Sequence, residues 1–136
     1  MQYTAIATAS GSGRNGQVRS DDGRVDLVLR IPTELGGAGG GSNPEQLFAA
    51  GYAGCFLSAL DSVARQRRIK LVDASITAAV TIAHGEDGFG LAVRLTAHLP
   101  GLDSETATEM LTGAHARCPY SKAVRGNISV ELETAQ

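Results

Sequence analysis

The segment that most constrains the fold is an uncharged stretch, residues 47–60 (LFAAGYAGCFLSAL). It follows Asn43, a good helix N-cap, and Pro44, which suits the first position of a helix. Gln46 stands three residues after Asn43, where its side-chain amide can complete a capping box. These signals predict a helix from Pro44 to about Arg68. Because residues 47–60 carry no charge on any face, we expect this helix to be buried nearly all round.

Strand-like segments lie on both sides of this helix and predict antiparallel sheet. Residues 85–88 are typical of a hairpin loop, and a second helix is expected from Asp103 to Arg117. The expected strands are residues 3–8, 25–31, 75–84, 89–99 and 127–133. The chain has 136 residues, of which 43% are hydrophobic, which is enough for one core. We therefore expect a single α+β domain over residues 1–136, with antiparallel sheets packed around the long central helix.

The charge balance argues against several partners. The net charge is −2, and the one basic cluster, residues 65–70, is explained by cations that oppose a helix dipole. We therefore expect no nucleic-acid partner. Residues 1–10 lack a basic flank followed by an apolar segment, and no run is expected to reach the roughly eighteen residues that span a bilayer. The expected location is the cytoplasm, without a membrane partner.

Two cysteines, Cys55 and Cys118, lie 63 residues apart. A single cysteine is most often a small buried hydrophobe, but Cys55 lies among ample apolar residues and Cys118 precedes a proline that starts a turn. A disulfide across this loop would stabilise the chain by about 4 kcal/mol if the geometry allows it. Either the two thiols meet or both are inert. The histidines, at 84, 98 and 115, lack zinc-site spacing, so no metal is expected.

Reactivity at Cys55 would require a nearby cation. Cys55 lies 12 residues beyond the Asn43 cap, about 18 Å along the helix axis and far from the positive end of the dipole. A desolvated thiol in apolar surroundings stays protonated. The best candidate for the cation is Arg14, in the glycine-rich segment 11–16 (GSGRNG), although such an arginine is usually just solvated.

Residues 36–41 (GGAGGG) precede the helix N-terminus, as a phosphate-binding loop would. Their spacing does not fit, because a dinucleotide fingerprint needs a glycine where Ser42 stands, and no Gly-Lys-Ser/Thr follows. We interpret the segment as a mobile loop that would serve as a lid if it borders an active site.

Four motifs together closely resemble those of the organic hydroperoxide resistance (Ohr) proteins. They are residues 35–40 (LGGAGG), 43–52 (NPEQLFAAGY) leading to Cys55, 118–121 (CPYS) and 125–128 (RGNI). The resemblance covers essentially the whole chain. The sister branch of osmotically inducible proteins (OsmC) shares the helix start and both cysteines, whereas the Cys-Pro-Tyr-Ser form and the glycine loop are typical of the Ohr branch.

The resemblance implies an Ohr/OsmC-like intertwined homodimer that reduces organic and fatty-acid hydroperoxides and protects against organic peroxide stress. It implies that Cys55 is the peroxidatic thiol, Cys118 the resolving thiol, and Arg14 with Glu45 the activating pair. Cys55 would pass through a sulfenic acid to a disulfide with Cys118. Dihydrolipoyl groups, as dihydrolipoamide or on a lipoylated protein, would regenerate the thiols, and no bound cofactor is expected. Asn15 stands where relatives often carry an acidic residue, which we expect to alter the charge of the loop and leave the chemistry intact.

Helix geometry makes the implied dimer more specific. Glu45 and Cys55 are 10 residues apart on one helix, hence separated by about 15 Å along its axis and roughly 80° around it. A Glu45 that binds Arg14 can hardly serve its own Cys55. An antiparallel partner helix removes this difficulty, and three small residues would permit its approach: Ala50, Gly51 and Gly54. We expect a two-fold dimer in which each site combines Cys55 and Cys118 of one chain with Arg14 and Glu45 of the other.

Two other functional classes remain open. A redox-responsive binding protein would also use paired thiols, but it would not turn over many equivalents of peroxide. An acyl-transfer enzyme would use His115 as the base for Cys118 or Cys55, although helix packing explains that spacing more simply. Taken alone, Glu45 is equally a first-turn carboxylate that complements the helix dipole. Three apolar residues suit an alkyl peroxide and are equally good core residues: Phe48, Phe56 and Leu57.

Overall fold

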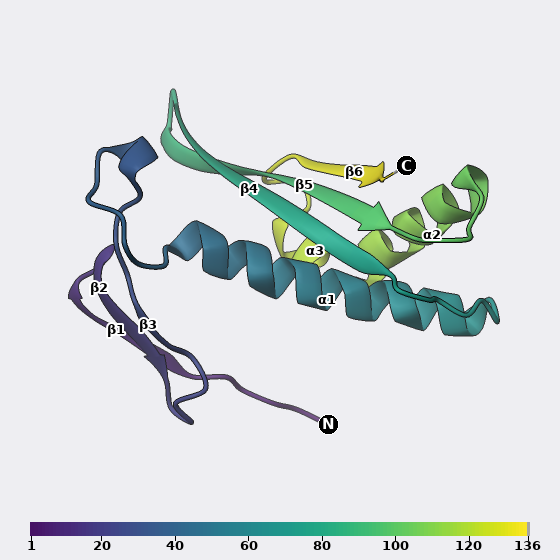
Figure 1. The fold of residues 1–136 in the computed structure, drawn as a ribbon, viewed down its shortest axis with the longest axis horizontal. Helices are drawn as coiled ribbons and strands as arrows, with labels where there is room; N and C mark the ends of the chain where they lie inside the picture. The colour runs from purple at the N-terminus through teal and green to yellow at the C-terminus, as the bar shows by residue number, and fades with distance from the viewer. Residues whose placement is uncertain (136) are drawn as a thin grey trace. The chain divides into compact units, whose positions relative to one another are not determined.

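A computed structural model of the chain describes residues 1–135. The chain divides into two compact units, residues 1–47 and 48–136, and the long helix α1 (Pro44–Gln66) begins in the first and continues in the second. The folded elements are of both kinds, α and β, as the sequence predicts (Figure 1). The expectation of one domain over residues 1–136 stays a prediction.

The first unit is built on a three-stranded antiparallel sheet in the order β1-β2-β3. Its strands are β1 (Ala7–Ser12), β2 (Asn15–Ser20) and β3 (Asp26–Val28), and a 3₁₀ turn, η1 (Thr33–Leu35), follows. A two-residue turn, Gly13 and Arg14, joins β1 to β2, and Gly13 has φ 59°, a backbone conformation that glycine adopts without strain.

The strands of this unit differ from the sequence prediction. The first strand lies at Ala7–Ser12 instead of residues 3–8, and the third is shorter than residues 25–31. The second, Asn15–Ser20, was not predicted, because its sequence NGQVRS has no apolar alternation. All residues of β1 are exposed. Strand β1 therefore forms by pairing with β2 across the Gly13–Arg14 turn and buries no apolar face.

The glycine-rich loop folds back on the segment that follows β3. The backbone N–H of Gly37 donates to Pro32 O at 3.0 Å, and that of Gly39 donates to Ile31 O at 3.0 Å. Ser42 N–H then donates to Val28 O at 2.9 Å. The loop thus has a defined set of backbone hydrogen bonds, and its suggested role as a lid stays a prediction.

The predicted capping box at the start of α1 is present. Gln46 N–H donates to Asn43 Oδ1 at 2.9 Å, and Asn43 N–H donates to Gln46 Oε1 at 3.2 Å. Two orphan donors of the first helical turn are satisfied reciprocally in this way. The box fixes where the helix begins and therefore where Glu45 lies in its first turn.

The second unit contains the sheet β4-β5-β6 with the remaining helices (Figure 1). Strands β4 (Ser75–Gly85) and β5 (Gly88–His98) form the predicted hairpin around residues 85–88. Two helices, α2 (Ser104–Arg117) and α3 (Pro119–Val124), precede β6 (Val130–Thr134). Strand β6 pairs with β5 in parallel, which corrects the expectation of purely antiparallel sheet. Helices α2 and α3 carry the chain from the end of β5 back along the sheet. Strand β6 can therefore run beside β5 in the same direction.

The core of this unit is one cluster that joins α1, β5 and α2. Helix α1 contributes a single face, with residues spaced by three and four positions. Its buried members are Tyr52, Phe56, Ala59, Leu60, Val63 and Ala64. Strand β5 adds three buried residues, and α2 adds four: Val93, Leu95, Ala97, Ala107, Met110, Leu111 and Ala114.

Burial of α1 is one-sided in the single chain, whereas the sequence suggested burial nearly all round. Ala50, Gly54 and Ser58, spaced by four residues along the helix, are exposed. The helix also holds an 18-residue window of mean hydropathy 1.4, long and apolar enough by composition to cross a membrane. The expectation that no run reaches this length was therefore wrong. Core helices pass the same test, and the packed face of α1 is that of a core helix.

Replacement of the N-cap residue of α1 should measurably lower the stability of the protein. Asn43→Ala removes the acceptor for Gln46 N–H, so we expect the free energy of unfolding to fall by about 1 kcal/mol in urea denaturation. Asn43→Asp is the matched control, because it keeps an acceptor oxygen and should change stability by less than about half as much. Equal stability of the two variants would contradict a structural role for the cap.

Candidate active site

The structure brings the two predicted thiols together. Cys55 lies on α1, Cys118 lies between α2 and α3, and their Sγ atoms are 3.5 Å apart. Both are free thiols, since a disulfide bond is about 2.05 Å long. The sequence left open whether the two thiols meet or are both inert, and in the structure they meet. A shortening of the distance between the two sulfurs by about 1.5 Å would suffice to form the bond.

The two sulfurs differ in access to solvent. Cys118 is fully buried, whereas Cys55 is only partly buried. Cys118 is both the C-cap of α2 and the N-cap of α3. Its N–H donates to Ala114 O at 2.8 Å, and its C=O accepts from Lys122 N–H at 3.0 Å. Its backbone is therefore held by both helices.

The surroundings of Cys55 raise the pKa of its thiol. Desolvation by the protein is the largest cause, a hydrogen bond from the backbone N–H of Tyr120 lowers the pKa, and the adjacent Cys118 raises it again. The net direction is upward, so these groups leave the thiol protonated at neutral pH. The need for a cation near Cys55, inferred from the sequence, therefore persists in the folded unit.

Tyr120, whose backbone N–H lowers the pKa of Cys55, is a residue of the site that the sequence analysis missed. Its N–H belongs to the first turn of α3, a helix that was predicted only as a turn. The signal was present in Pro119, because proline is common at the first position of a helix, where its missing N–H costs nothing. That pattern predicts free backbone N–H groups just after the proline, next to Cys118.

The ring of Tyr120 packs on α1. Its centroid lies 5.7 Å from that of Tyr52 and 6.1 Å from that of Phe48. Beneath it lies Gly51, where an added Cβ would come within 2.7 Å of the Tyr120 hydroxyl oxygen. The absence of a side chain at Gly51 thus allows α3 to approach α1, whereas an added Cβ at Gly54 would meet nothing within 4 Å.

A buried polar chain lies beside Cys118. Ser121 Oγ is 2.8 Å from the hydroxyl of Tyr52 and 2.9 Å from Nδ1 of His115. Ser121 and Tyr52 are fully buried. Burial lowers the pKa of His115, and the nearby Arg125 lowers it further, so the imidazole is mostly neutral at neutral pH. Arg125 also donates to His115 O at 2.7 Å.

This arrangement bears on the acyl-transfer alternative. The hydrogen-bonding partner of His115 Nδ1 is Ser121 Oγ. Within residues 1–135, neither sulfur has a hydrogen bond to His115. A cysteine–histidine dyad requires such a bond, so the geometry does not favour this function.

In the first unit, Arg14 and Glu45 form the predicted pair. Arg14 Nη1 donates to Glu45 Oε2 at 2.8 Å and Nη2 donates to Oε1 at 2.6 Å, a bidentate ion pair. Arg14 lies in the β1–β2 turn and Glu45 in the first turn of α1. The hydrogen bond to Arg14 is the main cause that lowers the pKa of Glu45, and it raises that of Arg14. Both groups are therefore charged at neutral pH.

Comparison with known proteins gives the relationship. The sequence pattern of the family described as OsmC-like protein matches residues 37–133. The chain belongs to the OsmC-like family. It is 50% identical over 135 residues to an organic hydroperoxide resistance protein of Xanthomonas axonopodis pv. citri (strain 306), with 98% of this chain and 94% of that protein covered. OhrB of Bacillus subtilis (strain 168) is 45% identical over 133 residues, with 96% of each covered.

Solved structures agree with the sequences. The crystal structure of an organic hydroperoxide resistance protein from Legionella pneumophila matches with a TM-score of 0.94 and 50% identity, and the match covers 100% of this chain and 99% of that one. Within the OsmC-like family, the chain therefore groups with the Ohr proteins, which confirms the resemblance inferred from its motifs.

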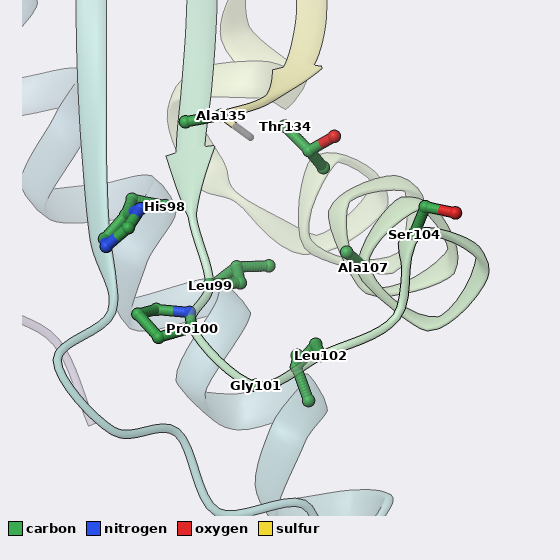
Figure 2. A pocket seen from close by; sticks show the side chains of 9 residues that line it. All are labelled: His98, Leu99, Pro100, Gly101, Leu102, Ser104, Ala107, Thr134 and Ala135. Carbon is green, nitrogen blue, oxygen red and sulfur yellow. The ribbon is translucent and has the colours of Figure 1, made fainter.

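This OsmC-like protein also has a hollow of about 290 Å³ in its second unit (Figure 2). The hollow lies where β5 ends and the loop to α2 begins, close to the end of β6. Apolar side chains such as Leu99 and Leu102 line it, together with the hydroxyls of Ser104 and Thr134. It includes none of the four residues that the resemblance implies are catalytic, Arg14, Glu45, Cys55 and Cys118. No cluster of three or more potential metal ligands was found among residues 1–135.

Proposed function

We propose that this protein is a thiol peroxidase that reduces organic hydroperoxides to alcohols. The observation that carries the proposal is the approach of the two sulfurs to 3.5 Å, one partly accessible and one fully buried. The names of its relatives, organic hydroperoxide resistance proteins at 45–50% identity, support the same substrate class and a role in resistance to organic peroxides.

The chemistry needs two steps. The thiolate of Cys55 attacks the distal oxygen of the hydroperoxide, the O–O bond breaks, and the alkoxide takes up a proton and leaves as the alcohol. Cys55 is then a sulfenic acid. The sulfur of Cys118 attacks the sulfenic sulfur, the S–O bond breaks, and the departing hydroxide with the proton of Cys118 forms water. The product is the Cys55–Cys118 disulfide.

The difference in burial between the two thiols supports the order in which they act in this proposal. A fully buried sulfur cannot meet a peroxide that arrives from solvent, whereas Cys55 is partly open. A backbone N–H, that of Tyr120, also favours the thiolate of Cys55. Cys55 is therefore the peroxidatic thiol in this proposal, and Cys118 is the resolving thiol.

Arg14 would supply the missing cation. Its bond to Glu45 uses two of the five N–H donors of the guanidinium group, so three remain for a thiolate or a peroxide oxygen. Glu45 fixes the plane of the guanidinium through the bidentate contact. A cation next to Cys55 would counteract the effect of burial on the pKa of its thiol.

The apolar residues of the site favour an alkyl hydroperoxide over hydrogen peroxide as the substrate. Phe48 and Leu57, like Cys55, are partly buried against the core cluster, while Phe56 is fully buried and serves as core. Apolar contact with an alkyl group contributes binding that hydrogen peroxide cannot gain. Fatty-acid hydroperoxides belong to the same class.

We further propose that the disulfide is regenerated by dihydrolipoyl groups, as dihydrolipoamide or on a lipoylated protein, with no cofactor bound to the chain. The disulfide would have one fully buried sulfur, which a slender dithiol arm reaches more easily than a bulky protein thiol. A reducing compartment, the cytoplasm, suits a transient catalytic disulfide.

The proposed functional state is a two-fold homodimer with shared sites. The exposed small residues of α1, Ala50 and Gly54, would admit a second copy of the helix. An antiparallel second helix would bring the partner's Arg14 and Glu45 to the thiols of the first chain, which the 15 Å or so between Glu45 and Cys55 along one helix makes difficult within a chain.

Separate replacement of the cysteines tests the peroxidase. Cys55→Ser should abolish consumption of cumene hydroperoxide in the presence of a dithiol, because the nucleophile is gone. Cys118→Ser should consume about one equivalent and then accumulate sulfenic and sulfinic forms of Cys55, measured by mass spectrometry. A Cys55→Ser variant as active as the wild type would exclude the mechanism, and a wild type limited to one equivalent would favour a redox-responsive binding protein.

The reductant is tested by steady-state rates with tert-butyl hydroperoxide. We expect turnover with dihydrolipoamide to exceed that with glutathione by at least about tenfold, since the second thiol of a dithiol completes the exchange intramolecularly. Dithiothreitol serves as the control, because it is a dithiol without the lipoyl chain. Comparable rates with dihydrolipoamide and glutathione would contradict the proposal.

Complementation tests the shared site. Mixed Cys55→Ser and Arg14→Ala chains should form heterodimers with one intact site and about half of the wild-type activity per dimer. Mixed Cys55→Ser and Cys118→Ser chains are the control and should stay inactive in turnover, since both thiols of a site come from one chain. Verified heterodimers of the first kind without activity would show that the sites are not shared.

A further inference from the structure

The hydroxyl of Ser121 joins three helices, and the mechanism above does not use it. Ser121 belongs to α3, Tyr52 to α1 and His115 to α2, and the two hydrogen bonds of Ser121 Oγ measure 2.8 and 2.9 Å. Every buried polar side-chain atom among residues 1–135 has a hydrogen-bonding partner, so this row of hydrogen bonds leaves no polar atom unsatisfied. It lies three residues from the resolving thiol, Cys118.

A hydroxyl is suited to this position because it can donate and accept at one atom. In the arrangement that satisfies all three groups, Tyr52 O–H donates to Ser121, and Ser121 O–H donates to Nδ1 of the neutral imidazole of His115. An alanine at 121 would break both bonds at once. It would leave the fully buried hydroxyl of Tyr52 without its partner.

The turn that carries Cys118 needs such support. Helix α3 has six residues, too few to be stable as an isolated helix. Its contacts with α1 are the Tyr120 ring over Gly51 and the bond from Ser121 to Tyr52. Its link to α2 is the bond from Ser121 to His115, reinforced where Arg125 donates to His115 O. The side chain of Ser121 thus forms hydrogen bonds with side chains of both other helices.

We propose that Ser121, with Tyr52 and His115, is a positioning device that holds the Cys118 sulfur against Cys55, so that the sulfenic acid is captured before a second peroxide can oxidise it. This inference rests on the proposed peroxidase function. The competing reaction is attack of the sulfenate on a second hydroperoxide, which breaks its O–O bond, releases a second alcohol and leaves a sulfinic acid that cannot form the disulfide. The share of each route depends on how fast Cys118 attacks.

The geometry explains why small displacements matter. The sulfurs are in contact at 3.5 Å, and a displacement of about 1 Å in a reacting group can cost as much as 100-fold in rate. Loosening α3 would move Cys118 and weaken the hydrogen bond from Tyr120 N–H to Cys55, but Cys55 itself would stay on α1 as the nucleophile. The device therefore acts on the second step of the cycle more than on the first.

The test separates the two steps in reduced protein. Ser121→Ala and His115→Leu should react with one equivalent of cumene hydroperoxide within about threefold of the wild-type rate, whereas disulfide formation should slow by at least about tenfold. The sulfinic fraction at Cys55 under excess peroxide should rise, as measured by mass spectrometry. His115→Asn is the conservative variant: its side-chain amide can replace Nδ1, so it should resolve at nearly the wild-type rate.

A second measurement does not depend on peroxide chemistry. Diamide, a diazene oxidant, takes up the two electrons and two protons of a thiol pair and leaves a disulfide. The same variants should form the Cys55–Cys118 disulfide with diamide at least about tenfold more slowly than the wild type. Thr112→Val is the matched control, because it removes a hydroxyl that donates to Thr108 O on the exposed side of α2 and keeps a branched side chain, and it should behave as the wild type.

The outcomes are distinct. Wild-type rates of disulfide formation in folded Ser121→Ala and His115→Leu, by both oxidants, would overturn the proposal, as would an equal loss in His115→Leu and His115→Asn. If Ser121→Ala does not fold, the His115 pair decides alone, because that side chain is only partly buried. If the wild type does not reduce peroxide, the proposed function fails, while a slow diamide reaction in the variants would still support the positioning role.

Discussion

Packing of one face of α1 against β5 and α2 is the interaction on which the second unit depends. Tyr52, Phe56 and Leu60 are fully buried there, and complete burial of such side chains contributes about 1.5–3 kcal/mol each. The same contact fixes the rotation of α1 about its axis. Cys55 follows at the margin of that buried face and is therefore only partly open. The position of Cys55, the thiol proposed to react with peroxide, is thus a consequence of core packing.

The surroundings of Cys55 oppose its ionisation and protect its product at the same time. Burial raises the pKa of the thiol, and the single N–H of Tyr120 offsets this only in part. The ion pair of Arg14 with Glu45 is the charged group that our proposal brings to the thiol. In the proposed mechanism, a buried Cys118 in contact with Cys55 would make overoxidation less competitive. Low polarity, which hinders the thiolate, also suits an alkyl substrate.

Local signals predicted the elements that local interactions determine. The capping box at Asn43, the hairpin at residues 85–88 and the helix expected from Asp103 to Arg117 were all correct, since each depends on residues within a few positions. Strand β2 and helix α3 were missed, because one lacks apolar alternation and the other has only six residues. The parallel pairing of β6 was also missed, because it depends on the path of the chain through two helices.

By itself, the sequence determined to which family the chain belongs and suggested which residues carry the proposed chemistry, because motifs such as Cys-Pro-Tyr-Ser are local and need no fold to be read. Only the tertiary structure decided that the thiols of residues 63 positions apart touch, that Tyr120 offers its N–H to Cys55, and that Ser121 joins three helices. The physical reason is that such contacts depend on how helices pack, to within about 1 Å, and side-chain periodicity does not encode distances between elements.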